Sequence, residues 1–249
     1  MRIFVDSSQI KSSLITVSDD QYHYLSRVIR LRRKELLEIV VDESSVLEIE
    51  FLGFVDQKLQ YNQVDEKKIE KPILDITLIQ SLPKQNKFID IIDHVTQAGV
   101  KDIFPVYTSR SVVKWDKKKE NNYQKKWTQR CFSAAAQSKQ GFVANIHAIT
   151  TLSDCLESID FSEFDLCLVA WEEETSVTLH NVVKNYLDAY KVCIVVGPEG
   201  GLSSDEIDLI YKKGFDIISI GRSIFRVEIA ALVCITQLLY CYELRTIKG

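Results

Sequence analysis

A turn with three glycines and a proline, G-P-E-G-G at residues 197–201, directly follows an apolar run. Glycine-rich turns between a strand and a helix often hold phosphate, because bare backbone N–H groups can approach an anion. Glu199 stands in the middle of this turn, and its carboxylate would repel an anion. The turn therefore predicts either a ligand that is neutral or cationic at this point, or a structural turn without a ligand.

The glycine spacing argues against a dinucleotide site. The turn is not G-x-G-x-x-G, and no acidic residue is placed about 20 residues on to hold a ribose. Pro198 stiffens the turn, and Gly200 and Gly201 permit positive φ angles. Ser203 is a good N-cap for the next helix, with Glu206 completing a capping box. The turn is thus predicted to lie where a strand meets a helix.

A second glycine turn, S-I-G-R-S-I-F-R-V-E, spans residues 219–228. It leaves a strand-like run through Gly221 and carries Arg226 and Glu228 at the start of a long apolar helix. Catalytic groups tend to lie on loops of this kind, which a rigid scaffold positions. The alternative is a surface ion pair that contributes less than about 1 kcal/mol.

The first 70 residues predict a small β-barrel, because they hold several short β-rich runs around one helix. That helix begins at Ser18, with Gln21 as its capping-box partner. Its periodicity places Leu25 and Ile29 on one apolar face.

Residues 71–249 read differently, because apolar strand-like runs alternate with helices. The alternation predicts an open α/β sheet whose buried strands are parallel. Ligands bind such sheets beyond the carboxyl ends of the strands. The two glycine turns should therefore meet in one pocket.

The composition is that of an ordinary globular protein, with 249 residues, 46% hydrophobic and 27% charged. The N-terminal residues lack the apolar stretch of a signal peptide or membrane helix, so we expect a cytoplasmic protein with no membrane partner. The six cysteines have no C-x-x-C spacing. We therefore expect reduced thiols and no bound metal.

Two basic segments stand out against a net charge of −4, which by itself does not favour nucleic acid. Residues 27–34 carry five positive charges, and residues 114–130 carry seven against two acids. Such runs are common on solvated faces. The aromatic residues Trp115, Tyr123 and Trp127 lie within the second segment, which favours RNA because stacking and phosphate contacts combine there.

Together, the two turns resemble the ribosomal RNA small-subunit methyltransferase E (RsmE) family of the SPOUT superfamily. That family carries G-P-E-G-G-[FL]-[ST]-x-x-E, and residues 197–206 match it throughout. It also carries L-G-x-x-I-L-R-x-E-T-A, where residues 220–230 read I-G-R-S-I-F-R-V-E-I-A. Residues 22–35 and 99–114 resemble two further family segments, so the resemblance runs along the whole chain.

The resemblance implies a PUA-like β-barrel RNA-binding domain over residues 1–70 and a SPOUT-type α/β trefoil-knot methyltransferase domain over residues 71–249. It also implies a homodimer that binds S-adenosyl-L-methionine, whose sulfonium cation suits a turn with a carboxylate. The residues implied to bind this cofactor are Val196, Gly197, Pro198, Glu199, Gly200, Gly201, Ile220, Gly221, Ile224 and Phe225.

The implied reaction is methylation of N3 of a specific uridine in 16S ribosomal RNA, near the decoding site of the small ribosomal subunit. Arg226 is the candidate for stabilising the uridine anion through its fixed fork of donors. Glu228 either orients Arg226 or accepts the N3 proton. The implied RNA contacts are Arg27, Arg30, Arg110 and Lys114.

The chain departs from the family at four charged positions, where it carries His94, Gln97, Ala136 and Gln140. One explanation is that charged residues that interact with each other in the family were lost together in this chain. The other is that the RNA target or the activity of the enzyme has changed. An active ribosomal RNA methyltransferase is the leading hypothesis. The alternative is a non-catalytic or retargeted RNA- or ribosome-binding relative that keeps the fold.

Overall fold

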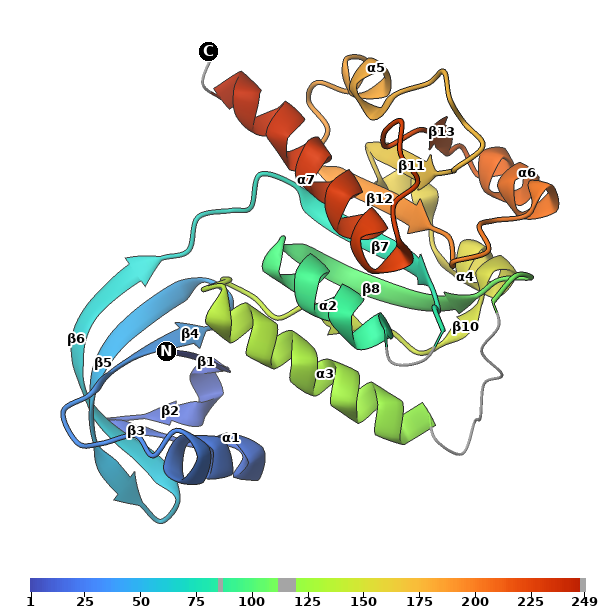
Figure 1. Cartoon of the computed structure of the whole chain (residues 1–249). Helices are drawn as coiled ribbons and strands as arrows, with labels where there is room; N and C mark the ends of the chain where they lie inside the picture. The colour runs from blue at the N-terminus through green and yellow to red at the C-terminus, as the bar shows by residue number, and fades with distance from the viewer. Residues whose placement is uncertain (85–86, 112–119, 247–249) are drawn as a thin grey trace. The chain divides into compact units, whose positions relative to one another are not determined.

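A computed structural model of the chain describes residues 1–84, 87–111 and 120–246. The described chain divides into two compact units (Figure 1). Unit 1 comprises residues 1–71 and a returning segment, 135–143. Unit 2 comprises residues 72–134 and 144–249. The assignment of an RNA-binding domain to residues 1–70 and a methyltransferase domain to residues 71–249 stays a proposal.

Unit 1 is a curled six-stranded sheet in the order β1-β4-β5-β6-β3-β2. Its first pair, β1 and β4, is parallel, and the other pairs are antiparallel. The end strands β1 and β2 do not pair in this order, so the predicted barrel is a half-barrel. The strands are β1 (Arg2–Val5), β2 (Ile10–Lys11), β3 (Leu14–Ile15), β4 (Leu36–Val41), β5 (Ser45–Val55) and β6 (Lys58–Lys68).

The helix of unit 1 begins as predicted and ends earlier than its periodicity suggests. The Ser18 hydroxyl accepts a hydrogen bond from Gln21 N, and the Gln21 side chain accepts one from Ser18 N. Helix α1 (Asp19–His23) then passes into a π-helical turn over Tyr24–Val28. Leu25 is buried, but Ile29 is 36% exposed, because the chain has left the helical path by that point.

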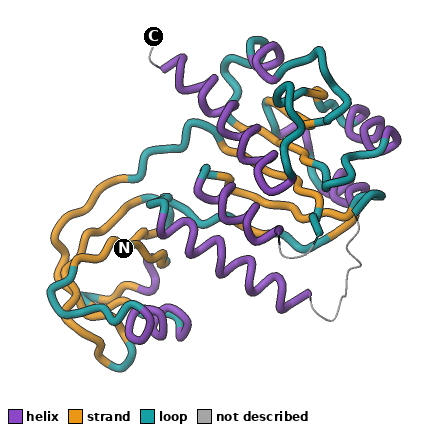
Figure 2. The backbone as a smooth tube through the Cα atoms, in the orientation of Figure 1, coloured by secondary structure: helices purple, strands orange, loops and turns teal. Residues whose placement is uncertain are grey.

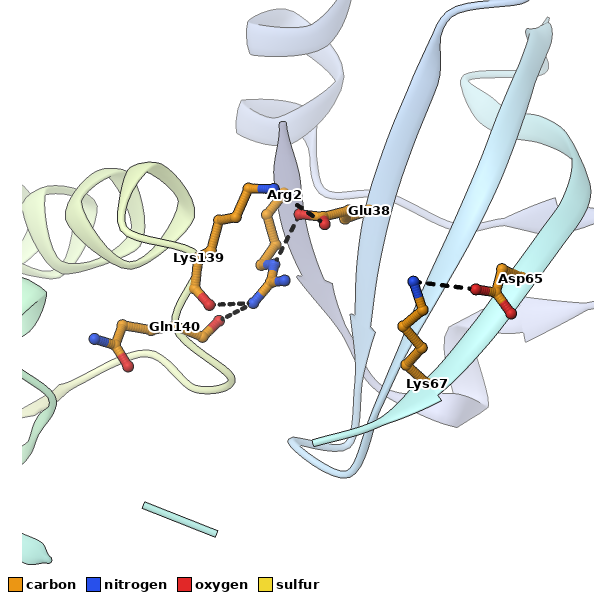
Figure 3. Close-up of polar contacts among 6 residues, drawn as sticks. All are labelled: Arg2, Glu38, Asp65, Lys67, Lys139 and Gln140. Carbon is orange, nitrogen blue, oxygen red and sulfur yellow. Dashed lines mark hydrogen bonds and ion pairs between the residues drawn. The ribbon is translucent and has the colours of Figure 1, made fainter. Parts of the chain in front are cut away.

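Arg2 on β1 ties the returning segment 135–143 to the sheet (Figure 3). Its Nε lies 3.2 Å from a carboxylate oxygen of Glu38 on β4, and its Nη1 donates to the carbonyl oxygens of Lys139 and Gln140. The Arg2 side chain is only 10% exposed. A charged group at this depth depends on its partners, because unpaired burial is costly.

Replacing Arg2 with methionine is expected to lower the free energy of unfolding of unit 1 by about 2 kcal/mol, because Glu38 and two carbonyls lose a charged donor. Chemical unfolding followed by circular dichroism measures the loss. The matched control is Lys67→Met, since Lys67 pairs with Asp65 on the exposed surface of the same sheet (Figure 3). An exposed pair contributes little, so the control should unfold like the parent protein. Equal effects of the two substitutions would contradict the account.

The same contact makes unit 1 sensitive to acid. Burial raises the pKa of Glu38, but the hydrogen bond and charge of Arg2, with the charge of Lys139, outweigh burial and hold that pKa below its ordinary value. The stabilisation from ionised Glu38 is therefore present above the ordinary carboxyl pKa and is lost as pH falls through the lowered pKa. Part of this pH dependence should disappear in Arg2→Met.

Unit 2 is built on a seven-stranded sheet in the order β10-β8-β7-β12-β11-β13, with β9 paired to β8. Every pair is parallel, which confirms the predicted parallel α/β sheet. The strands are β7 (Asp75–Ser81), β8 (Val100–Tyr107), β9 (Asn145–Ile146), β10 (Thr150–Thr151), β11 (Leu166–Ala170), β12 (Lys191–Val196) and β13 (Asp216–Ile218). The trefoil knot implied by the resemblance stays a prediction.

Helices cover this sheet (Figure 2). Leu152 and Leu156 of α4 and Ile207 and Ile210 of α6 pack in one core cluster with alternate residues of the buried strands, while α2 packs against α7. The helices are α2 (Lys87–Gln97), α3 (Glu120–Gln137), α4 (Leu152–Ser158), α5 (Leu179–Val183), α6 (Ser204–Lys212) and α7 (Val227–Thr246). By length and composition alone α7 could span a membrane, a test that core helices of soluble proteins also pass.

Candidate functional site

A cavity of about 970 Å³ lies beyond the carboxyl ends of β11, β12 and β13, which are neighbours in the sheet of unit 2. Its walls come from the loops that follow these three strands and from the starts of α2 and α7. This is the position at which open parallel sheets bind ligands. We call this cavity the loop pocket.

The residues predicted from the two glycine turns lie together in the loop pocket. The residues predicted to bind a cofactor and the two predicted to be catalytic all line it. They are Val196, Gly197, Pro198, Glu199, Gly200, Gly201, Ile220, Gly221, Ile224, Phe225, Arg226 and Glu228. The two turns therefore share one cavity, as their place after parallel strands predicted, and the role of each residue stays a proposal.

The 197–201 turn is closed by a hydrogen bond from Gly201 N to the Pro198 carbonyl, 2.9 Å long. Gly201 has a φ of 70°, and a Cβ built on it would overlap the Glu172 carboxylate. Gly200 does not adopt a positive φ, contrary to the expectation, but a Cβ there would lie 3.2 Å from Cβ of Arg110. Both positions are thus confined to glycine or nearly so by close neighbours.

The helix after the turn begins as predicted, and its cap reaches a further loop. The Ser203 hydroxyl accepts from Glu206 N, and one Glu206 oxygen accepts from Ser203 N at 2.9 Å. The other Glu206 oxygen accepts from Ser109 N at 2.6 Å. The guanidinium group of Arg110 donates to the Gly200 carbonyl at 3.0 Å. The loop after β8 is therefore fastened at two points, to the first turn of α6 through Glu206 and to the 197–201 turn through Gly200.

A cluster of three charged side chains lies on one wall of the loop pocket. Nζ of Lys87, at the start of α2, lies 2.8 Å from Oε1 of Glu228 and 3.3 Å from Oε1 of Glu199. Both oxygens of Glu199 also accept from Lys84 N, at 3.0 and 3.2 Å. The cluster carries two negative charges and one positive charge, which makes this wall net negative.

The pKa values of the cluster follow from these contacts. The hydrogen bond to Glu228 raises the pKa of Lys87, and the contact with Glu199 acts in the same direction against partial burial. The hydrogen bond from Lys87 lowers the pKa of Glu228 below its ordinary value. Both groups are therefore charged at neutral pH.

The alternative of a surface pair between Arg226 and Glu228 does not hold in the structure. Within the described ranges, Glu228 makes its ion pair with Lys87, and no pair with Arg226 is found there. Arg226 is exposed, lines the loop pocket and precedes the first turn of α7, whose Ile229 N and Ala230 N donate to its carbonyl.

The four predicted RNA contacts do not all belong to one unit of the described chain. Arg27 and Arg30 belong to unit 1, where both are exposed. Arg110 belongs to unit 2, and its guanidinium group holds the Gly200 carbonyl. Lys114 lies outside the described residues.

Lys87, Trp171 and Glu172 are among the pocket residues that the sequence analysis missed. The latter two follow β11, whose apolar run predicted a buried parallel strand. The rule that ligands bind at carboxyl ends of strands would have found them, had it been applied to this third strand. No motif marked Lys87.

His94 behaves as a helix-face residue. Its Nδ1 lies 3.3 Å from the Glu228 carbonyl oxygen, so it contributes to the contact between α2 and α7. Within the described part of the chain, no group of three His, Cys, Asp or Glu residues is arranged to hold a metal.

Comparisons with known proteins agree on one family. The model of the RNA methyltransferase domain matches residues 69–239. The ribosomal RNA small subunit methyltransferase E of Rickettsia conorii is 28% identical over 95% of this chain and 93% of its own length. The protein of the same name from Synechocystis sp. is 28% identical over 95% of this chain and 76% of its own length.

Solved structures share the fold over almost the whole chain. The ribosomal RNA small subunit methyltransferase E of Neisseria gonorrhoeae, bound to S-adenosyl methionine, superposes with a TM-score of 0.81 at 22% identity and 97% coverage of both chains. The Legionella pneumophila methyltransferase Lpg2936, also with this cofactor, gives 0.83 at 21% identity and 96% coverage of both chains.

Proposed function

Because the chain belongs to the RNA methyltransferase domain family, as an RsmE-type member, we propose that it transfers a methyl group from S-adenosylmethionine to N3 of a uridine in 16S ribosomal RNA. The observation that carries the proposal is that two family motifs, distant in sequence, line one pocket at the carboxyl ends of neighbouring strands. The test is whether the protein methylates unmodified small ribosomal subunits. We also propose a cytoplasmic location, because that is where this substrate is found.

The loop pocket fits this cofactor in charge and in shape. Glu199 and Glu228 make one wall net negative, which suits a sulfonium cation. Gly197 and Gly201 line the cavity with bare backbone, and a Cβ on Gly201 would overlap the Glu172 carboxylate in the wall. Among the residues that line the pocket, two buried polar atoms have no hydrogen-bond partner in the described chain: Trp171 Nε1, a donor, and Glu228 Oε2, an acceptor. A bound polar molecule can satisfy both.

Deprotonation of the uridine and stabilisation of its anion are assigned to residues of this chain. S-adenosylmethionine supplies an electrophilic methyl group when bound. Uridine N3 must lose its proton before it can accept the methyl group, so the site has to stabilise an anion. Arg226, exposed at the pocket, is assigned that task because its guanidinium is always charged and presents several donors. Glu228 is ionised and can accept the N3 proton or a hydrogen bond.

The alternative function is a non-catalytic or retargeted RNA- or ribosome-binding relative. Four positions support this alternative. The family carries charged residues there, whereas this chain carries His94, Gln97, Ala136 and Gln140. Against it stands the complete loop pocket, because a pure binding module has no need of a glycine turn fitted to a cofactor.

We assign RNA contacts in unit 1 to Arg27 and Arg30, which are exposed beside the exposed apolar side chains of Tyr24 and Val28. Arginines beside an aromatic ring suit phosphates and unstacked bases. The double variant Arg27→Ala/Arg30→Ala should weaken binding of 16S RNA fragments and reduce the slope of log affinity against log salt by about 1 to 2. Filter binding at several salt concentrations measures this slope. An unchanged slope would remove these two phosphate contacts.

We also propose a homodimer that forms through α7. Only 33% of the residues in the apolar stretch Val227–Leu244 of this helix are buried in the single chain. Large apolar side chains remain exposed along it, namely Ile229, Tyr240 and Leu244. An exposed apolar face of this extent is typical of a protein interface, and a second copy is the commonest partner.

A further inference from the structure

Lys87 joins three segments that are far apart in the sequence. It stands at the start of α2, Glu199 belongs to the turn after β12, and Glu228 belongs to the first turn of α7. Its Nζ lies 2.8 Å from Glu228 Oε1 and 3.3 Å from Glu199 Oε1. All three side chains are about two-thirds or more removed from solvent, so water screens the contacts only in part.

The two carboxylates would repel each other without Lys87. Their Oε1 atoms lie no more than about 6 Å apart, the sum of their two distances to Nζ. Glu199 has a second support in Lys84 N, whereas Oε2 of Glu228 has no partner in the described chain. Lys87 is therefore the group that holds Glu228 in its place.

We propose that Lys87 is a positioning residue for methyl transfer: its ammonium group clamps the carboxylates of Glu199 and Glu228 and so holds the 197–201 turn against the start of α7. The clamp belongs to the free protein, and its role in methyl transfer rests on the proposed function. Lys87 acts through the two carboxylates, and no contact of its own with the reacting atoms is required.

The clamp also fixes the charge of Glu228. The groups that face this residue are Lys87 from α2, Glu199 from the turn after β12, and Arg226 from its own segment. His94 approaches only its carbonyl oxygen. Lys87 is the one of these groups that hydrogen-bonds the carboxylate. The free Oε2 can then accept a hydrogen bond or a proton but cannot donate, because an ionised carboxylate has no proton to give.

The first experiment measures the titration of Glu228 in the protein without cofactor, by carbon-detected NMR of glutamate carboxyl groups. Glu228→Gln identifies the signal. In Lys87→Met the pKa of Glu228 should rise toward its ordinary value, because the hydrogen bond and the charge of Lys87 that lower it are removed. In Lys87→Arg, which keeps the positive charge, the pKa should stay near the parent value. An unchanged pKa in Lys87→Met would overturn the proposal.

The second experiment measures S-adenosylmethionine affinity by calorimetry and the pH dependence of methyl transfer. Lys87→Met should weaken affinity about tenfold, because the repelled carboxylates no longer hold the turn against α7. The acid limb of kcat/KM should move to higher pH, as the pKa of Glu228 rises. Lys87→Arg should recover most of the S-adenosylmethionine affinity and most of the parent pH dependence of kcat/KM. The matched control is Lys212→Met, an exposed lysine at the end of α6 outside the pocket lining.

The two claims fail in different ways. If the parent protein neither binds S-adenosylmethionine nor transfers a methyl group, the proposed function fails, while the NMR titration still decides whether Lys87 clamps the carboxylates. If the parent protein is active but Lys87→Met matches Lys212→Met in affinity and pH profile, the clamp has no role in methyl transfer. If Lys87→Arg is as impaired as Lys87→Met, the charge is not what matters, and the proposal is wrong.

Discussion

Replacing Arg226 with alanine is expected to lower kcat for methyl transfer by about 100- to 1000-fold, the usual loss when one charge-stabilising group is removed. Arg226 is an exposed cation of the loop pocket at the start of α7, and the carboxylate of Glu228 is already paired with Lys87. It is thus available to an anion that forms on the substrate. S-adenosylmethionine affinity should change by less than about threefold, since a loss confined to kcat marks an interaction made in the transition state.

The conservative variant Arg226→Lys separates charge from geometry. Lysine keeps the positive charge but loses the planar fork of donors, so it should recover only part of the activity. Single-turnover kinetics with excess enzyme would isolate the chemical step from product release. Parent-like turnover in Arg226→Ala would remove Arg226 from the reaction.

Replacing Gly201 with alanine should weaken S-adenosylmethionine binding at least about tenfold, equivalent to 1.4 kcal/mol. Two effects add. The φ of 70° is costly for any residue with a Cβ, and the new Cβ would overlap the Glu172 carboxylate and displace it in the loop pocket. Calorimetric titration of the cofactor measures the loss.

Gly214→Ala is the matched control. Gly214 ends α6 with a φ of 89°, so alanine meets the same backbone strain, but a Cβ there has no atom within 4 Å. Both variants should lose similar thermal stability, while only Gly201→Ala loses cofactor affinity. Equal affinities in the two variants would show that the close approach at Gly201 is irrelevant to binding.

Local patterns predicted much of the scaffold that carries the site. The capping boxes at Ser18 and Ser203 are present as predicted, because each depends on side chains three residues apart. The continuous apolar runs form parallel strands in the structure, as predicted. A strand that is apolar on both faces has to be buried on both faces, as strands of a parallel sheet are. The meeting of the two glycine turns followed from the general rule for parallel sheets.

The missed features depend on contacts between distant segments. Lys87 is one of many lysines until the fold brings it to Glu199 and Glu228. Arg110 stays a predicted RNA contact, and only the fold reveals that its guanidinium group also donates to the Gly200 carbonyl. The end of the first helix was misjudged because a π-helical turn interrupts the 3.6-residue period. The short elements β9, β10, α4 and α5 have too few residues for a periodic signal.

The most direct measurement is transfer of labelled methyl from S-adenosylmethionine to small ribosomal subunits that lack the modification, followed by nucleoside mass analysis. The account predicts N3-methyluridine at one position in 16S RNA, and methylation slowed about 100- to 1000-fold with Arg226→Ala under the same conditions. Cofactor binding without transfer to these subunits would contradict the proposed target and favour a retargeted enzyme. Neither binding nor transfer would contradict the enzymatic function itself and leave a binding relative that keeps the fold.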